Sequence, residues 1–287
     1  MNLLIDNIFE AFMMEGGNAV HADRIPASAG PKIFAEVEDK LERVSGYEMR
    51  LLGSVGKKAD PDTNGDIDIA VLTSDKSSLI DCIEQAFPDC EMNDKTGPGI
   101  VSIGYPYELH SGRSIVAQVD FMMVDDLEWA EFFYGSPDYT KNESVFKAAL
   151  RNWLMSITFS CLPVGELPKT DEEGRTIAKW KYAFSAAGVN KQWLEYTGRG
   201  GAFLKSPKKV KELEQFVTKN WKEVLGMVFK NPDRKQFTSV ETLWAALHSN
   251  EFLYGKGVLA EIEQRFEDEA LASIGKSLDD FKAAIGE

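Results

Sequence analysis

The spacing of hydrophobic and polar residues predicts a mixture of helices and strands in the first half of the chain. Apolar side chains three or four residues apart predict helices, and alternating or continuous apolar runs predict strands. The predicted helices are residues 3–12, 31–44 and 77–87, and the predicted strands are 47–54, 65–73, 99–105 and 113–124. We therefore expect an α+β domain at residues 1–143, with a helix at its N-terminus.

The pattern changes after residue 143 and becomes helical. The predicted helices are residues 144–161, 206–226, 257–266 and 277–285. The segment 206–226 has the clearest pattern, because Ser206 is a typical N-cap, Pro207 suits the first helical position, and large apolar residues follow at helical spacing. We expect a helical C-terminal domain at residues 144–287.

Composition narrows the class of protein. The chain has 287 residues, of which 44% are hydrophobic, enough for a substantial core. Its three cysteines, Cys82, Cys90 and Cys161, form no CxxC pair, so neither a disulfide framework nor a zinc site is expected. The N-terminus lacks the basic opening of a secretory signal, and no apolar run reaches the roughly 18 residues of a membrane span. We expect a soluble, cytoplasmic protein with no membrane partner.

Charge is distributed unevenly. The formal net charge is -14, yet residues 175–235 contain 14 basic and 5 acidic residues and carry +9, which leaves -23 on the rest of the chain. This segment is either a solvated lysine-rich surface or a surface that binds phosphate or nucleic acid. Several of its aromatic residues lie close to cations, where they could stack on bases, although core packing is the commoner role. They are Trp180, Tyr182, Phe184 and Phe203.

The stretch "LLGSVGKKADPDTNGDIDIA", residues 51–70, contains the strongest chemical signal. Side chains alternate between the two faces of a strand, so Asp66 and Asp68 should share one face while Ile67 and Ile69 occupy the other. Two neighbouring carboxylates repel each other unless a cation neutralises them. Hard oxygen ligands suit Mg²⁺ or Mn²⁺, which commonly bind together with substrate phosphates.

A third aspartate and a small turn complete this pattern. Asp120 lies in the apolar strand "SIVAQVDFMMV" and is a natural third ligand. If the two strands are neighbours, the three carboxylates can hold two metal ions about 4 Å apart. Gly53 would let the backbone approach a phosphate closely, and the hydroxyl of Ser54 and the amides that follow could bind phosphate oxygens.

The combination of a Gly-Ser turn, a DxD pair on a strand and a later aspartate on another strand resembles the polymerase-beta-like nucleotidyltransferase superfamily. The wording "SVGKKADPDTNGDIDIAV" is also similar to nucleotidyltransferases of tailed phages. The resemblance implies a mixed sheet flanked by helices that binds a nucleoside triphosphate, such as ATP, with two divalent metal ions. Gly53 and Ser54 match the turn, Asp66 and Asp68 the pair, and Asp120 the late carboxylate.

The resemblance also implies contacts between basic residues and the triphosphate. Lys57 and Lys58 lie in a loop that carries an arginine in many members, and an ordinary solvated loop explains them equally well. Arg151, on the predicted helix after the sheet, is the other candidate. Asp125 and Asp126 follow the Asp120 strand closely, and we expect a loop or a helix cap there rather than metal ligands.

The resulting functional expectation is a nucleotidyltransferase that moves a nucleoside monophosphate from a triphosphate to an acceptor hydroxyl and releases pyrophosphate. An RNA 3′ end, such as that of a tRNA, is the expected acceptor, bound at the basic segment 175–235. Transfer to a small molecule or to a protein is an alternative, and so is a non-catalytic nucleotide-binding module of the same fold. A plain α/β scaffold with incidental aspartates is a third interpretation.

Overall fold

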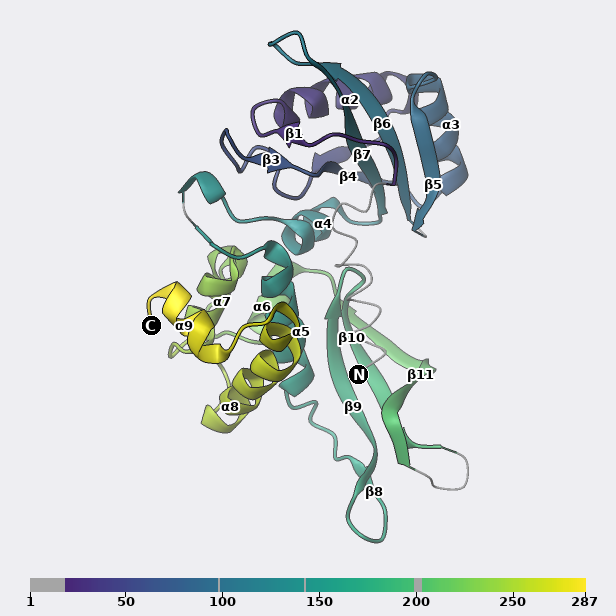
Figure 1. The fold of residues 1–287 in the computed structure, drawn as a ribbon. Coiled ribbons are helices and arrows are strands. Elements are labelled where there is room, and N and C mark those ends of the chain that lie inside the picture. Colours follow the sequence, from purple (N-terminus) through teal and green to yellow (C-terminus); the bar gives the residue numbers. More distant parts are fainter. Residues whose placement is uncertain (1–18, 98, 142, 199–202) are drawn as a thin grey trace. The chain divides into compact units, whose positions relative to one another are not determined.

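The computed structural model describes residues 19–97, 99–141, 143–198 and 203–287, which have an α+β architecture (Figure 1). They divide into two compact units, one ending at Ser144 and the other beginning at Val145. We call these the N-terminal unit and the C-terminal unit. The helix predicted at residues 3–12 lies outside the described residues. Within the part of the chain that the structure describes, no helix combines the length and the apolar character needed to cross a bilayer.

The N-terminal unit is built on a five-stranded mixed sheet with the strand order β2-β4-β7-β6-β5. β4 and β7 are parallel, and the other neighbouring strands are antiparallel. Its elements are β1 (Ile25–Pro26), α2 (Gly30–Ser45), β2 (Met49–Leu51), β3 (Thr63–Asn64), β4 (Asp66–Leu72), α3 (Lys76–Ala86), β5 (Glu91–Gly97), β6 (Ile100–Glu108), β7 (Ser114–Val124), α4 (Leu127–Tyr134) and η1 (Tyr139–Lys141).

One face of this sheet forms the main core of the N-terminal unit. Ile67 and Ile69 of β4 and Phe121 of β7 are 0% exposed, and they belong to one apolar cluster with the inner faces of α2 and α3. Burial of each such side chain contributes about 1.5–3 kcal/mol. The alternate positions of β4 and β7 point to the other face, where Ala70 packs with Leu127 at the start of α4.

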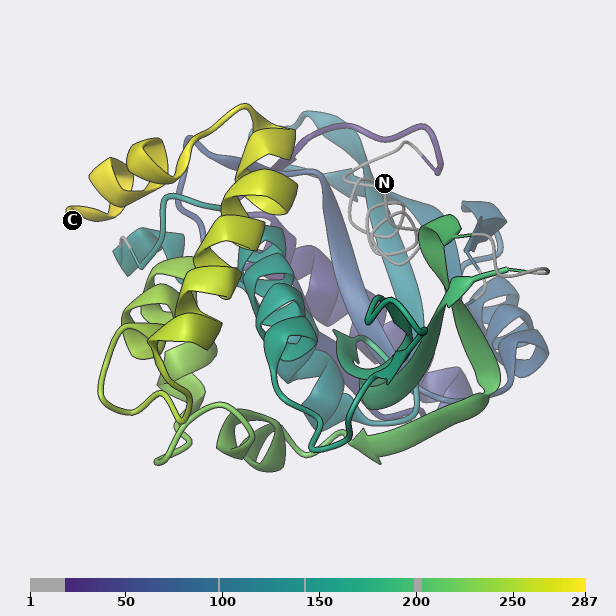
Figure 2. The same cartoon turned by 90° about the horizontal axis from the view of Figure 1, so that it is seen from below.

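The C-terminal unit combines a four-stranded antiparallel sheet, in the order β11-β10-β9-β8, with a group of helices. Phe159 of α5 stacks on Phe184 of β9 with 5.6 Å between ring centroids, and α8 lies alongside α5 (Figure 2). The elements are α5 (Ala148–Cys161), β8 (Lys169–Thr170), β9 (Thr176–Ser185), β10 (Gly188–Thr197), β11 (Phe203–Thr218), α6 (Trp221–Gly226), η3 (Arg234–Phe237), α7 (Val240–Leu247), α8 (Lys256–Arg265), η4 (Phe266–Leu271), η5 (Ala272–Ile274) and α9 (Leu278–Ile285).

The prediction of a purely helical C-terminal domain is therefore wrong. The segment 206–226, predicted as one helix, forms most of strand β11 and then the short helix α6. β11 pairs with β10 through several register shifts, and its apolar residues Leu213, Phe216 and Val217 are exposed, so their helix-like spacing does not mark a buried face. Pro207 lies on this edge strand, where a missing backbone N–H is tolerated.

The aromatic residues of the basic segment divide between core and surface. Core packing is confirmed for Phe184, which is 1% exposed, and is wrong for Phe203, which is 46% exposed. Trp180 is half-buried and packs edge-on against Trp193, with ring centroids 5.3 Å apart. Only some of these aromatic side chains are therefore exposed to solvent.

The two faces of β4 predict different responses to truncation. Ile69→Ala should destabilise the protein by about 2–5 kcal/mol, because Ile69 is fully buried in the core of the N-terminal unit. Leu72→Ala, at the 37% exposed end of the same strand, should cost far less. Urea unfolding monitored by circular dichroism measures both. Equal losses for the two variants would contradict this assignment of the core.

Candidate metal centre

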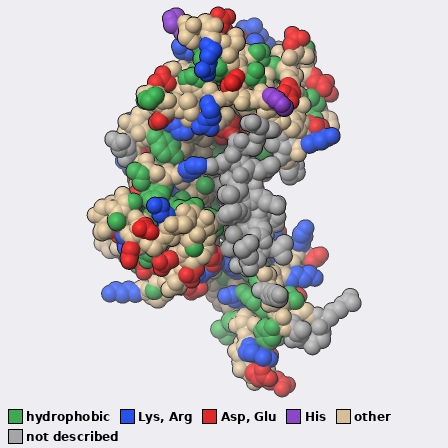
Figure 3. Space-filling model, viewed as in Figure 1, with side chains coloured by type: hydrophobic (Ala, Val, Ile, Leu, Met, Phe, Trp, Pro, Cys, Tyr) green, Lys and Arg blue, Asp and Glu red, His purple; other side chains and the backbone are tan. Residues whose placement is uncertain are grey.

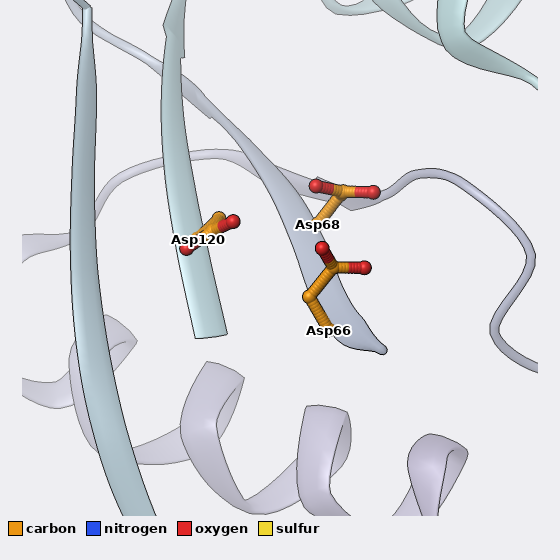
Figure 4. A group of neighbouring side chains, drawn as sticks. All are labelled: Asp66, Asp68 and Asp120. Atoms are coloured by element: carbon orange, nitrogen blue, oxygen red, sulfur yellow. The ribbon is translucent and has the colours of Figure 1, made fainter. Parts of the chain in front are cut away.

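Three aspartates meet on the face of the N-terminal sheet opposite the main core. Asp66 and Asp68 extend from β4, and the parallel register places Asp68 directly beside Asp120 of β7 (Figure 4). One carboxylate oxygen from each residue lies within 4.8 Å of the others. A cluster of this kind can hold a metal ion, because three oxygen ligands converge on one point.

The electrostatics of the cluster favour a bound cation. Burial raises the pKa of Asp68 well above its usual range, and the charges of Asp66 and Asp120 raise it further. Burial also raises the pKa of Asp120, which is 9% exposed. A divalent ion would relieve both the loss of hydration and the mutual repulsion of these groups. The residues present therefore fit a metal ion that prefers oxygen ligands.

Asp120 is held in place by its neighbours on the sheet. The Nε2 atom of Gln118 donates to both carboxylate oxygens of Asp120, at 3.1 and 3.0 Å, and the Gln118 Oε1 atom accepts from the backbone N–H of Ala19 at 3.2 Å. Hydrogen bonds from Ser102 and Gln118 partly offset the effect of burial on the pKa of Asp120. These contacts orient a ligand that would otherwise be free to rotate.

Gly53 occupies a position that favours glycine. Its φ angle is 64°, in the left-handed region, and a Cβ atom added there would lie 2.7 Å from Oδ2 of Asp68. The backbone N–H of Leu52 donates to the carbonyl of Asp68 at 2.9 Å, which ties the turn to β4. The Gly-Ser turn therefore lies directly against the acidic cluster.

Tyr134, at the end of α4, is a neighbour of the cluster that sequence alone does not indicate. Burial, followed by the charge of Asp68, raises the pKa of Tyr134 to about 12, so its hydroxyl stays protonated. Asp126 is the N-cap of α4, and its side chain accepts from the backbone N–H of Trp129 at 2.9 Å. We expected a loop or a helix cap after the Asp120 strand, and Asp126 forms the cap.

The other predicted nucleotide-binding residues of the N-terminal unit surround the turn. Ser54 is half-buried, and its hydroxyl donates to Oδ1 of Asn64 at 3.2 Å. The Nζ atom of Lys57 donates to the carbonyl of Ser136 at 2.7 Å, and that of Lys58 to the carbonyl of Thr63 at 3.2 Å. Both lysines thus contact backbone oxygens of the N-terminal unit, and their contact with a triphosphate stays a prediction.

Arg151 belongs to the C-terminal unit and is 2% exposed. Its guanidinium donates to Oδ1 of Asn152 at 3.1 and 3.0 Å and to the carbonyl of Phe237 at 3.1 Å, and it lies over the Phe237 ring. These contacts connect α5 to η3 and explain why a buried arginine is tolerated there. A role of Arg151 in nucleotide binding stays a prediction.

Two further residues lie near the cluster, and only one of them could have been predicted from the sequence. Gln118 was detectable in principle, because it lies two residues before Asp120 on a strand and must share its face. Asn64 was not, because its contact with Ser54 depends on how the loop between them folds.

No protein-family profile matches the chain, and no curated protein matches it.

Gly53→Ala should disturb the metal centre, whereas Gly46→Ala should not. Both glycines have a left-handed φ angle, so both variants should lose about 1–2 kcal/mol of stability. Only at Gly53 would the new methyl group meet Asp68, since nothing lies within 4 Å of a Cβ at Gly46. Calorimetric titration with Mn²⁺ should show at least a ~10-fold weaker affinity for Gly53→Ala alone. Equal Mn²⁺ affinity in both variants would contradict the proposed contact.

Asp68→Asn should stabilise the metal-free protein at neutral pH. Because the folded pKa of Asp68 is raised, the folded state binds its proton more tightly than the unfolded chain. Stability is therefore lost as pH rises from the unfolded pKa of about 3.9 to the folded pKa, and the loss persists above it. Removing the charge should raise the melting temperature in EDTA at pH 7 by roughly 2–4 °C, a gain that shrinks at low pH.

The same variant should lose the stabilisation that Mn²⁺ gives to the wild type. Asp94→Asn is the control, because Asp94 is exposed on β5 of the same sheet. A wild type that melts at the same temperature with and without Mn²⁺, or an Asp68→Asn variant less stable than wild type in EDTA, would count against the metal centre.

Proposed function

We propose that the protein is a metal-dependent nucleotidyltransferase that transfers a nucleoside monophosphate from a nucleoside triphosphate to an acceptor hydroxyl. The observation that carries the proposal is the register of β4 and β7, which gathers Asp66, Asp68 and Asp120 on one face of the sheet. The contact of Gly53 with Asp68 adds a close-packed turn beside the carboxylates. The resemblance to the polymerase-beta-like superfamily involves these same residues.

The three aspartates would hold the metal, and their environment limits how they can move. Gln118 and Ser102 fix Asp120, while the backbone contact between Leu52 and Asp68 fixes the turn relative to β4. When bound, Mg²⁺ or Mn²⁺ supplies Lewis-acid activation of the attacking hydroxyl and neutralises charge on the triphosphate. The protein contributes position, because a fixed set of ligands needs little reorganisation during the reaction.

The turn beside the aspartates is the proposed site of the triphosphate. The absence of a side chain at Gly53 lets the backbone of the turn lie against the Asp68 carboxylate, and Ser54 offers a half-buried hydroxyl next to it. Lys57 and Lys58 follow within the same loop, and their ammonium groups would attract the anionic substrate. These assignments form part of the proposal.

An RNA acceptor is the version of the proposal that the C-terminal unit supports best. On β11 the aromatic residues Phe203 and Phe216 are 46% and 62% exposed, and Lys208 and Lys211 on the same strand are also exposed. Basic and apolar side chains lie together over the part of the surface that holds β8–β11 (Figure 3). Exposed aromatic rings beside lysines are typical of proteins that stack bases and pair with phosphates.

Transfer of label from nucleotide to acceptor tests the proposal directly. The protein is incubated with each α-³²P-labelled nucleoside triphosphate, Mg²⁺ or Mn²⁺, and total RNA. Label should appear in RNA with the wild type and with Asp94→Asn, and should fall by about 100-fold or more with Asp66→Asn or Asp120→Asn, because each loses a metal ligand.

The location of the label separates the alternatives. Label on the protein or on a small molecule would keep nucleotidyl transfer and replace RNA as the acceptor. The proposal that the protein is an enzyme would be contradicted if the wild type transferred no label to any acceptor and if nucleotide with metal did not change its melting temperature.

A further inference from the structure

Asn64 places a buried amide beside the Gly-Ser turn. It ends β3, pairs with Ile25 of β1 and is 1% exposed. Its Oδ1 atom accepts a hydrogen bond from the hydroxyl of Ser54 at 3.2 Å. The residue proposed to bind phosphate is therefore held by a side chain that solvent does not reach.

The other end of the same amide has no partner. The Nδ2 atom of Asn64 is buried and makes no hydrogen bond. An unsatisfied buried donor of this kind costs about 1–3 kcal/mol and calls for an explanation. A Cβ atom on Gly30 would lie 3.3 Å from Nδ2, so the NH₂ group lies beside the first residue of α2.

The environment at the start of α2 disfavours a hydrogen-bond donor such as Nδ2 and favours a hydrogen-bond acceptor. A helix N-terminus carries the positive end of the helix dipole, which disfavours a hydrogen-bond donor and favours an acceptor. Rotating the amide of Asn64 by 180° would exchange its two ends. The oxygen would then face the first turn of α2, and Nδ2 would face the oxygen of Ser54.

The two orientations of the amide leave Ser54 in two different states. A serine hydroxyl has one proton to donate and two lone pairs that can accept. With Oδ1 towards Ser54, the serine proton is used in the bond to Asn64. With Nδ2 towards Ser54, the serine accepts from Asn64, and its proton is available to another acceptor.

We propose that Asn64 is a positioning residue whose Nδ2 atom donates to Ser54 in the nucleotide-bound protein, so that Ser54 donates its own proton to a phosphate oxygen. This inference rests on the proposed function. This orientation satisfies the orphan donor at Nδ2 and supplies the phosphate with a hydrogen bond from a fixed hydroxyl. Asn64 contacts no phosphate itself and acts through Ser54.

A double-mutant cycle between Ser54→Ala and Asn64→Leu tests the inference. Leucine has the same branching and the same number of side-chain heavy atoms as asparagine but no hydrogen-bonding group, so the space around position 64 should stay filled. Binding is measured by calorimetry with the α,β-methylene analogue of the nucleotide that stabilises wild type most, in the presence of Mg²⁺. We expect each single variant to weaken binding about 10-fold, and the double variant to bind no more weakly than Ser54→Ala alone.

Further measurements make the result specific. Asn64→Asp, which keeps the shape but has no donor when ionised, should also weaken nucleotide binding, and each variant is melted to show that it folds. The affinity for Mn²⁺ alone should be unchanged in Ser54→Ala and Asn64→Leu. Ser78→Ala is the control. Ser78 lies on α3, away from the turn in sequence, and this variant removes a half-buried hydroxyl that shares a hydrogen bond with Tyr47.

The possible failures are distinguishable. A wild type that binds neither Mn²⁺ nor the nucleotide analogue would overturn the proposed function, and the inference with it. If wild type binds both but the effects of Ser54→Ala and Asn64→Leu simply add, Asn64 acts independently of Ser54, and the inference alone is overturned. Nucleotide binding that is unaffected by Ser54→Ala would overturn it equally.

Discussion

The parallel pairing of β4 with β7 is the interaction on which the candidate metal centre depends. It places Asp68 beside Asp120, while Ile69 and Phe121 point to the other face and join the main core. Parallel neighbours need a crossover connection, and here the chain passes through α3, β5 and β6 before it returns as β7. Because α2 and α3 both pack on the apolar face, the core can anchor the strands while the opposite face carries the aspartates.

This arrangement concentrates negative charge where the sheet is partly shielded from water. Asp68 illustrates the consequence, because burial and its two acidic neighbours all disfavour its charged form. Hydrogen bonds from Gln118 and Ser102 stabilise the charged form of Asp120. Both donors are neutral, so they do not neutralise the charge of the cluster. A site that is less stable without a ligand is a frequent property of functional centres, since the ligand supplies the missing stabilisation.

The C-terminal sheet shows how one composition can serve two purposes. β11 is an edge strand, and such strands commonly carry lysine, proline and bulges, which prevent pairing with other chains. Pro207, Lys208 and Lys211 fit that role. The same lysines, together with Phe203 and Phe216, form the surface that we propose for RNA. Edge protection and polyanion binding both require exposed cations, so the two roles are compatible on one strand.

The sequence by itself determined the features that depend on local spacing. The alternation in "GDIDIAV" predicts which side chains of β4 face the core, and Ile67 and Ile69 are indeed fully buried. A cap at Asp126 was also predictable, because capping involves only the first turn of a helix.

Tertiary structure alone decided which distant residues meet. The register that joins Asp68 to Asp120, the contact of Gly53 with the Asp68 carboxylate, and the approach of Tyr134 all involve segments far apart in the chain. It also decided that residues 203–218 form a strand, because pairing with β10 and a series of bulges overrode a local spacing that suits a helix. Spacing along the chain specifies faces, whereas pairing between strands specifies partners, and a site made from several strands needs both.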